Sequence, residues 1–149
     1  MSYEFERGGA PEPGERGRSD PGEILQIVIQ HVRETLALPG EKSVEPHHLL
    51  FYDLGFTSMD MLDLLFRVEE HFGISIPEGT LAGLARGDVP EAAFEVEGDL
   101  TELGRERLMA LLHDTPAALF PERIRSSSLP RFCTVAAIAR LAEHETKAK

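Results

Sequence analysis

The chain has 149 residues, of which 42% are hydrophobic, and this length is typical of one domain rather than two. Its 26 Asp and Glu residues outnumber 15 Lys and Arg residues, and the formal net charge is −11. Nucleic acids and anionic membranes would repel such a chain, so we expect neither as a partner. The single cysteine, Cys133, excludes an intramolecular disulfide and a multi-cysteine zinc site, and it fits a reducing cytoplasm.

The first 18 residues are rich in Gly, Pro and charged residues. Such a segment cannot bury enough apolar surface to offset the entropy of ordering it, which predicts a disordered tail over 1–18. It has no apolar central region like that of a secretory signal, and nowhere does the chain reach the roughly 20 apolar residues of a membrane span. We expect a cytoplasmic protein with one domain over 19–145 and a short tail over 146–149.

A first helix is predicted over about 21–37, followed by a long loop over 39–57. Asp20 and Pro21 suit the cap and the first helical position. Pro39 and Gly40 end the helix. Apolar residues recur at helical spacing between these signals: Ile24, Ile27, Val28, Val32 and Leu36. The loop is itself unusually apolar, so we expect it to lie against a core.

The best-defined predicted helix covers 58–72 and ends at Gly73. Ser58 is expected to cap it, because a serine hydroxyl can accept a hydrogen bond from a free amide at a helix start. Asp60 lies in the first turn, where the helix dipole favours negative charge. One broad apolar face is predicted from Met61, Leu62, Leu65, Val68 and Phe72.

After this helix the chain loses regularity over 78–129, which contains one predicted helix at about 101–113 and a short turn at 117–120. That helix has leucines on one side: Leu103, Leu108, Leu111 and Leu112. A last helix is predicted over 134–144, with Thr134 as its cap. No alternating run is long enough for a sheet, so the predicted class is all-α: a bundle of three principal helices plus the helix at 101–113. The predicted core is Ile27, Val28, Leu54, Leu65, Val68, Phe72, Ile76, Val135 and Ile138.

Residues 52–77 carry four short motifs in order. They are Asp53-Leu54-Gly55, Ser58-Met59-Asp60, Glu69-Glu70-His71-Phe72 and Ile74-Ser75-Ile76-Pro77. Without a gap, they resemble the modification site of acyl carrier proteins and of the related carrier domains of polyketide and peptide synthases. Thr57 and Met59 depart from the commonest residues of that pattern, Asp and Leu. The stretch 78–129 is an insertion where the family has a much shorter link.

The resemblance implies that Ser58 carries 4′-phosphopantetheine, whose terminal thiol holds acyl intermediates as thioesters. The protein would then not be an enzyme; it would deliver its cargo within fatty acid, polyketide or related biosynthesis. The expected partners are a phosphopantetheinyl transferase and enzymes with basic docking patches, such as an acyl-loading ligase, a ketosynthase or an acyltransferase, and a monomer is expected. The implied docking surface comprises Asp53, Met59, Asp60, Leu62, Asp63, Phe66, Glu69 and Glu70.

Other functions stay open. The chain could be a peptidyl or aminoacyl carrier, or an unmodified helical adaptor that binds other proteins. A serine hydrolase using Ser58 is disfavoured, because a nucleophile elbow needs Gly two residues on either side of Ser, where Phe56 and Asp60 stand.

A metal site and a reactive thiol are also disfavoured. His47 and His48 are adjacent, so their side chains diverge, and the other four histidines are scattered. No His-x-x-x-His pair exists, so no metal site is expected. Cys133 is interpreted as a small buried residue.

Overall fold

The computed structural model describes residues 20–40 and 42–148. The disordered tail predicted over 1–18 lies outside the described residues. Within the described part, helices dominate, and the predicted all-α class is confirmed. No helix in these described ranges is long and apolar enough to cross a membrane.

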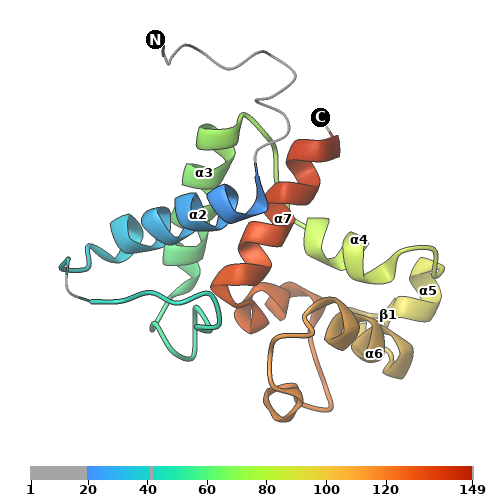
Figure 1. Cartoon of the computed structure of the whole chain (residues 1–149). Coiled ribbons are helices and arrows are strands. Elements are labelled where there is room, and N and C mark those ends of the chain that lie inside the picture. The colour runs from blue at the N-terminus through green and yellow to red at the C-terminus, as the bar shows by residue number, and fades with distance from the viewer. Residues whose placement is uncertain (1–19, 41, 149) are drawn as a thin grey trace.

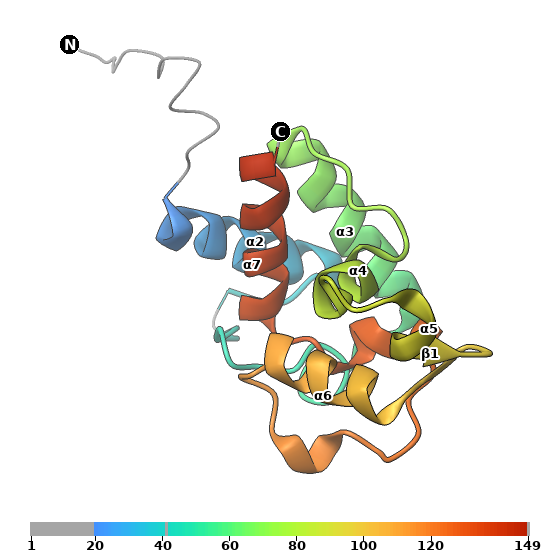
Figure 2. The same ribbon diagram turned by 90° about the vertical axis from the view of Figure 1, so that its right-hand side faces the viewer.

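Three long helices form the bundle that the sequence predicts: α2 (Pro21–Leu36), α3 (Ser58–Phe72) and α7 (Val135–Ala148). In Figures 1 and 2, α2 crosses α7 and also packs against α3. The predicted end of the last helix near His144 is wrong, because α7 continues to Ala148. No Gly or Pro interrupts this last turn, and an ion pair of 3.0 Å between Lys147 and Glu143 supports it.

The predicted helix starts are partly correct. Pro21 occupies the first turn of α2 as expected, but the side chain of Asp20 makes no capping hydrogen bond. Thr134 does cap α7, because its Oγ1 accepts from the amide of Ala137 at 3.0 Å.

Residues 78–129, which the sequence predicts to be an insertion and which we call the insertion, fold beside α7 (Figure 1). The predicted helix at 101–113 is present as α6 (Glu102–Leu111), with Thr101 as its cap. Short elements that the sequence did not indicate surround it: α4 (Thr80–Arg86), α5 (Glu91–Phe94), β1 (Glu95–Val96), β2 (Asp99–Leu100) and the 3-10 helix η2 (Ser126–Phe132). The short turn predicted at 117–120 is the 3-10 helix η1 (Ala117–Leu119).

The structure also contains a small two-stranded sheet, which no alternating pattern in the sequence indicated and which leaves the all-α class unchanged. Strands β1 and β2 pair antiparallel, with Glu95 opposite Leu100 and Val96 opposite Asp99. Glu97 and Gly98 form the tight turn between them, with φ angles of 53° and 86°. Two positive φ values in succession match the right-handed twist of a hairpin. Strands of two residues are too short to produce an alternating pattern in the sequence.

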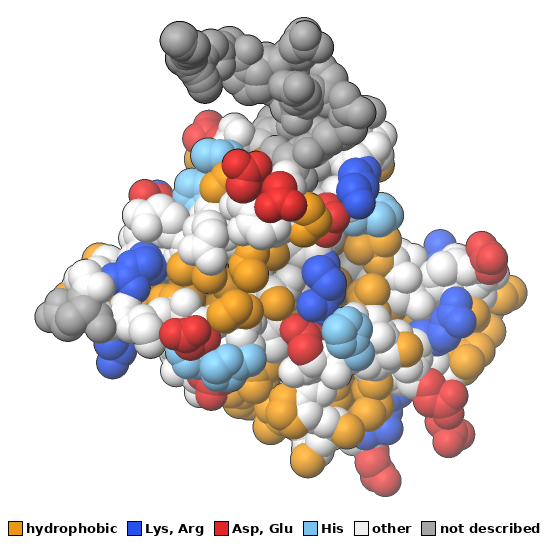
Figure 3. Space-filling model, in the orientation of Figure 1, with side chains coloured by type: hydrophobic (Ala, Val, Ile, Leu, Met, Phe, Trp, Pro, Cys, Tyr) orange, Lys and Arg blue, Asp and Glu red, His pale blue; other side chains and the backbone are white. Residues whose placement is uncertain are grey.

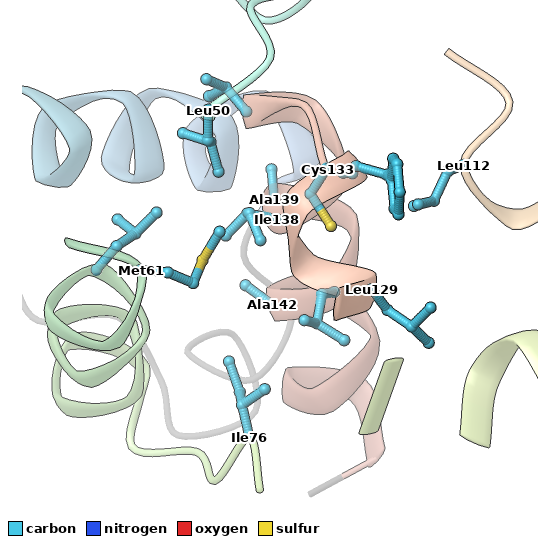
Figure 4. Packing of buried hydrophobic residues seen from close by; sticks show 14 of the residues in the cluster. Leu50, Met61, Ile76, Leu112, Leu129, Cys133, Ile138, Ala139 and Ala142 are labelled. Carbon is cyan, nitrogen blue, oxygen red and sulfur yellow. The ribbon is translucent and has the colours of Figure 1, made fainter. Parts of the chain in front are cut away.

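One hydrophobic core joins the bundle to the insertion. Figure 4 shows its centre, where Leu50 and Cys133 from loops meet Met61 of α3, Ile138 of α7 and Leu129 of η2. The predicted burial of the loop over 39–57 is confirmed, since Leu49, Leu50 and Phe56 are buried.

Five of the nine predicted core residues are buried, and the other four are only half-buried. Val28, Val68, Ile76, Val135 and Ile138 are buried, whereas Ile27, Leu54, Leu65 and Phe72 are half-buried. On α3 the fully buried position is Leu64, and Leu62 is 62% exposed. On α6, Leu108 and the following Leu112 are buried, whereas Leu103 is exposed and Leu111 is only half-buried. On α3, the buried side chains therefore lie on a different side of the helix from the predicted apolar face.

Candidate functional site

The loop before α3 is built to present the start of that helix. The side chain of Asp53 accepts a hydrogen bond from the amide of Leu49 at 2.8 Å and closes the loop on itself. The amide of Leu50 donates to the carbonyl of Cys133 at 3.2 Å, and the amide of Phe56 donates to the carbonyl of Leu50 at 2.9 Å. Gly55, at φ 72°, adopts the left-handed conformation that the chain needs just before Phe56. The backbone just before α3 is thus tied to the segment that leads into α7.

Ser58 is the first residue of α3, and the prediction that it caps the helix is wrong. The cap is Thr57, whose Oγ1 accepts from the amide of Asp60 at 3.2 Å. Asp60 returns the interaction, because its carboxylate accepts from the amide of Thr57 at 2.9 Å. Ser58 is exposed, and its hydroxyl forms no hydrogen bond with any residue of the described ranges. Its oxygen is therefore accessible for attachment.

The surroundings of this hydroxyl suit a phosphate group. The amide of Met61 donates to the carbonyl of Thr57 at 3.1 Å, so the amides of Ser58 and Met59 precede the first hydrogen bond of the helix. Amides at a helix start point toward a bound anion, and the helix dipole adds favourable potential there. These residues fit a phosphodiester on Ser58 Oγ.

A cavity of about 620 Å³ is lined in part by Ser58. Met61, Leu65 and Phe66 of α3 form one side of it, and Leu81 and Ala82 of α4 contribute another. Residues 126–131 of η2 form a further wall. Figure 4 shows Met61, Ile76 and Leu129 converging from three different segments, and all three line the cavity.

The eight residues proposed for docking share a region but differ in availability. Met59, Leu62 and Phe66 are 72%, 62% and 57% exposed and follow one another at helical spacing. Glu70 is also exposed and forms no hydrogen bond or ion pair with the described residues. These four side chains form an accessible row, which we call the α3 face.

The carboxylates of the other acidic candidates already accept hydrogen bonds within the protein. Asp53 and Asp60 accept the backbone hydrogen bonds described above, and Glu69 accepts from the amide of Ile76 at 2.6 Å. Asp63 accepts from Arg67 at 2.7 Å and from Thr35 at 2.8 Å, and these hydrogen bonds lower the pKa of its carboxyl group. Charge reversal at Asp63 or Glu69 would therefore disturb the structure as well as any docking contact.

The surface charge is dispersed on the face that Figure 3 shows. Acidic and basic side chains alternate there with hydrophobic ones, and no single-signed region covers that face.

Cys133 and the histidines do not build a second site. Cys133 is 1% exposed, and burial raises the pKa of its thiol to about 12, which keeps it protonated and unreactive. In the part of the chain that the structure describes, no three His, Cys, Asp or Glu side chains are grouped so as to hold a metal ion.

The structure adds cavity residues that sequence reasoning missed, above all Phe51, Arg131 and the serines at 126–128. Arg131 and these serines lie about 70 residues from Ser58 in the sequence, and tertiary contacts bring them to the same cavity. No local pattern in the sequence indicates such a contact.

Comparison with known protein families finds a match within the chain. Residues 26–86 match a family model described as a phosphopantetheine attachment site. This range includes α3, most of α2 and the whole of α4. No curated protein and no solved structure matches the chain significantly.

Proposed function

Residues 26–86 belong to the phosphopantetheine-binding carrier family, and on this premise we propose that the chain is an acyl carrier protein with its prosthetic arm on Ser58. Members of this family carry a covalently attached 4′-phosphopantetheine. When bound, this group supplies a terminal thiol that holds the cargo as a thioester. The observation that carries the assignment to Ser58 is its exposed and unengaged hydroxyl at the start of α3.

The residues around Ser58 have separate roles in fixing the helix start and in binding the phosphate. The capping box between Thr57 and Asp60 fixes the helix start without using the Ser58 hydroxyl. The free amides of Ser58 and Met59 stabilise the negative charge of a phosphodiester. Tethering then keeps the cargo at a high effective concentration for each enzyme that docks on the carrier.

The cavity beside Ser58 has room for part of an acyl cargo. Its lining from α3, α4 and η2 is rich in apolar side chains, including Met61, Leu65, Leu81 and Leu129. Burial of an acyl chain there is favourable by about 0.8 kcal/mol for each methylene group. α4 lies within the region that matches the family, whereas residues 126–129 of η2 belong to the part of the predicted insertion beyond it, and the lining from η2 supports a role for the insertion in holding the cargo.

Docking is proposed on the α3 face, defined above as Met59, Leu62, Phe66 and Glu70. Exposed apolar residues at helical spacing, with an acidic residue beside them, suit a partner that presents an apolar groove with basic residues at its edge. Carrier proteins in general interact with phosphopantetheinyl transferases and biosynthetic enzymes. The acyl-loading and chain-extending partners named above belong to the proposal.

The protein is proposed to perform no catalysis of its own. Among the described residues, the cavity that Ser58 lines contains no histidine that could act as a base for it. Carrier domains of this family are not catalytic.

One assay tests the function. The apo protein is incubated with coenzyme A and a broad-specificity phosphopantetheinyl transferase, and its intact mass is measured. We expect a gain of one phosphopantetheine group in the wild-type chain and in S127A, which alters another exposed serine that lines the cavity. S58A should gain nothing. An unmodified wild-type chain, under conditions that convert a control carrier, would favour the adaptor, and hydrolysis of a model ester would favour the enzyme.

A further inference from the structure

Arg131 differs from every other arginine in the described ranges. Each of the other eight donates at least one hydrogen bond to a side chain or a carbonyl group of the protein. Arg131 donates none to the described residues and forms no ion pair with them, although the chain has 26 acidic residues. Arg131 is an exposed residue, and no described residue accepts a hydrogen bond from its guanidinium group.

The side chain of Arg131 is nevertheless held in place. Its guanidinium carbon lies 5.9 Å from the centre of the Phe51 ring, over the ring. A cation–π contact of this kind does not use the N–H donors as hydrogen bonds to oxygen, so they remain available to a bound anion.

This position is close to the start of α3. The backbone hydrogen bonds from Phe56 to Leu50 and from Leu50 to Cys133 connect the residues just before Ser58 with the end of η2. Arg131 lies two residues from Cys133, and Ser58 lies two residues from Phe56. Arg131, Phe51 and Ser58 line the same cavity.

The charge balance of the cavity adds a second reason. Of the described residues that line it, Arg131 is the only cationic one, and Glu69 and Glu78 are the acidic ones. The carboxylate of Glu69 is already engaged by the amide of Ile76. A guanidinium fork matches the oxygen atoms of a phosphate group in geometry and charge.

We infer that Arg131 is a positioning residue that donates hydrogen bonds to the phosphate of the prosthetic arm and so directs the arm from Ser58 toward the cavity. This inference rests on the proposed function, because the phosphate is present only after Ser58 has been modified. It also gives η2 a specific role: the end of this segment brings a cation to a site that lies far from it in the sequence.

The test uses the modified protein and phosphorus NMR. Wild-type protein, R131Q, R131K and R123Q are converted, and intact mass confirms one arm on each. We expect the ³¹P resonance of the phosphodiester to shift in R131Q and to shift less in R131K, which keeps the charge but loses the fork. R123Q is the matched control, because the side chain of Arg123 is 81% exposed, pairs with Asp99 and does not line the cavity. Its ³¹P resonance should coincide with that of the wild type.

A second measurement needs no substitution. In the wild-type protein, the Nε–H resonance of Arg131 should move between the apo and the modified form, while that of Arg123 stays in place. Coincident ³¹P spectra for R131Q and wild type, or an unmoved Arg131 resonance, would overturn the inference and leave the proposed function intact. Absence of the mass gain would overturn both.

Discussion

At the scale of single residues, the important feature is that two adjacent hydroxyl groups have different roles. Thr57 caps α3, and Ser58 is left free for attachment. The sequence predicts the helix start correctly but assigns the cap to the wrong residue. The spacing of Thr57 and Asp60 was the available signal, because a hydroxyl residue and an acidic residue three positions later form a capping box.

Burial of individual side chains is less predictable than the helix that carries them. The pattern on α3 contains more apolar residues than one buried face can hold, so it does not specify whether Leu62 or Leu64 is inside. The neighbouring helices α2 and α7 make that choice. The hydrogen bonds of Asp63 with Thr35 and of Glu69 with Ile76 could not be predicted either, because each joins α3 to another segment.

Asp114 should make the stability of the protein depend on pH in the acid range. Burial acts to raise the pKa of its carboxyl group, but hydrogen bonds from Arg140 and Thr134 outweigh burial and hold the pKa below its ordinary value of 3.8. A group with a lowered pKa contributes stability above its unfolded-state pKa and loses it as the pH falls through its folded-state pKa.

We therefore expect D114N to be less stable than wild type at pH 7, and the difference to shrink as the pH falls below about 3.8. Urea unfolding at a series of pH values measures this. If the difference in the free energy of unfolding between wild type and D114N stays constant from pH 7 into the acid range, Asp114 does not have this role.

At the scale of elements, α6 is fixed against α5 by a glycine. A Cβ atom at Gly104 would lie 2.2 Å from the carbonyl oxygen of Phe94, so even alanine cannot fit without moving the backbone. We expect G104A to lower the free energy of unfolding by about 1–3 kcal/mol.

The matched control is Gly83, which lies within α4. Nothing lies within 4 Å of a Cβ built there, and its φ is not positive. G83A should raise the free energy of unfolding by about 0.5–1 kcal/mol, because alanine favours the helix. Urea denaturation of both variants is the measurement, and equal effects would show that the tight contact at Gly104 is unimportant.

The α3 face should determine how quickly partner enzymes act on the carrier. Leu62 is 62% exposed, so L62A should leave thermal stability nearly unchanged. Loss of the contact between Leu62 and the phosphopantetheinyl transferase should lower the kcat/KM of that enzyme for the protein roughly fivefold or more. L103A is the control, because Leu103 is 42% exposed on α6, within the insertion. Equal kinetics for L62A and L103A would contradict docking on the α3 face.

The elements of the insertion show where sequence reasoning stops. Helix α6 has ten residues and a capping threonine, and it was predicted. Helix α5 has four residues and strands β1 and β2 have two each, so no helical or alternating hydrophobic pattern can repeat within them. Such elements are stabilised by tertiary contacts, for example the hydrogen bond from Thr101 to the carbonyl of Phe94.

At the scale of the whole molecule, bundle and insertion share one core. Leu64 of α3 and Ile138 of α7 belong to the same buried cluster as Leu108 of α6. The bundle itself was predictable from three amphipathic helices. The cavity wall from η2 was not, because contacts between distant segments depend on the folded core.

Cys133 reports on this shared core, because it lies at its centre (Figure 4). We expect a thiol reagent to reach Cys133 only when the whole chain unfolds. The urea midpoint for thiol labelling should then equal the midpoint for loss of helical circular dichroism. Labelling at clearly lower urea would mean that the insertion separates from the bundle before the bundle unfolds.

The most direct measurement of the central claim is peptide mapping of the protein isolated from the cells that naturally produce it. Tandem mass spectrometry of the peptide that contains Ser58 should show 4′-phosphopantetheine on that serine, with release of the pantetheine part on fragmentation. A peptide carrying no modification at Ser58, or the group on a different residue, would contradict the account.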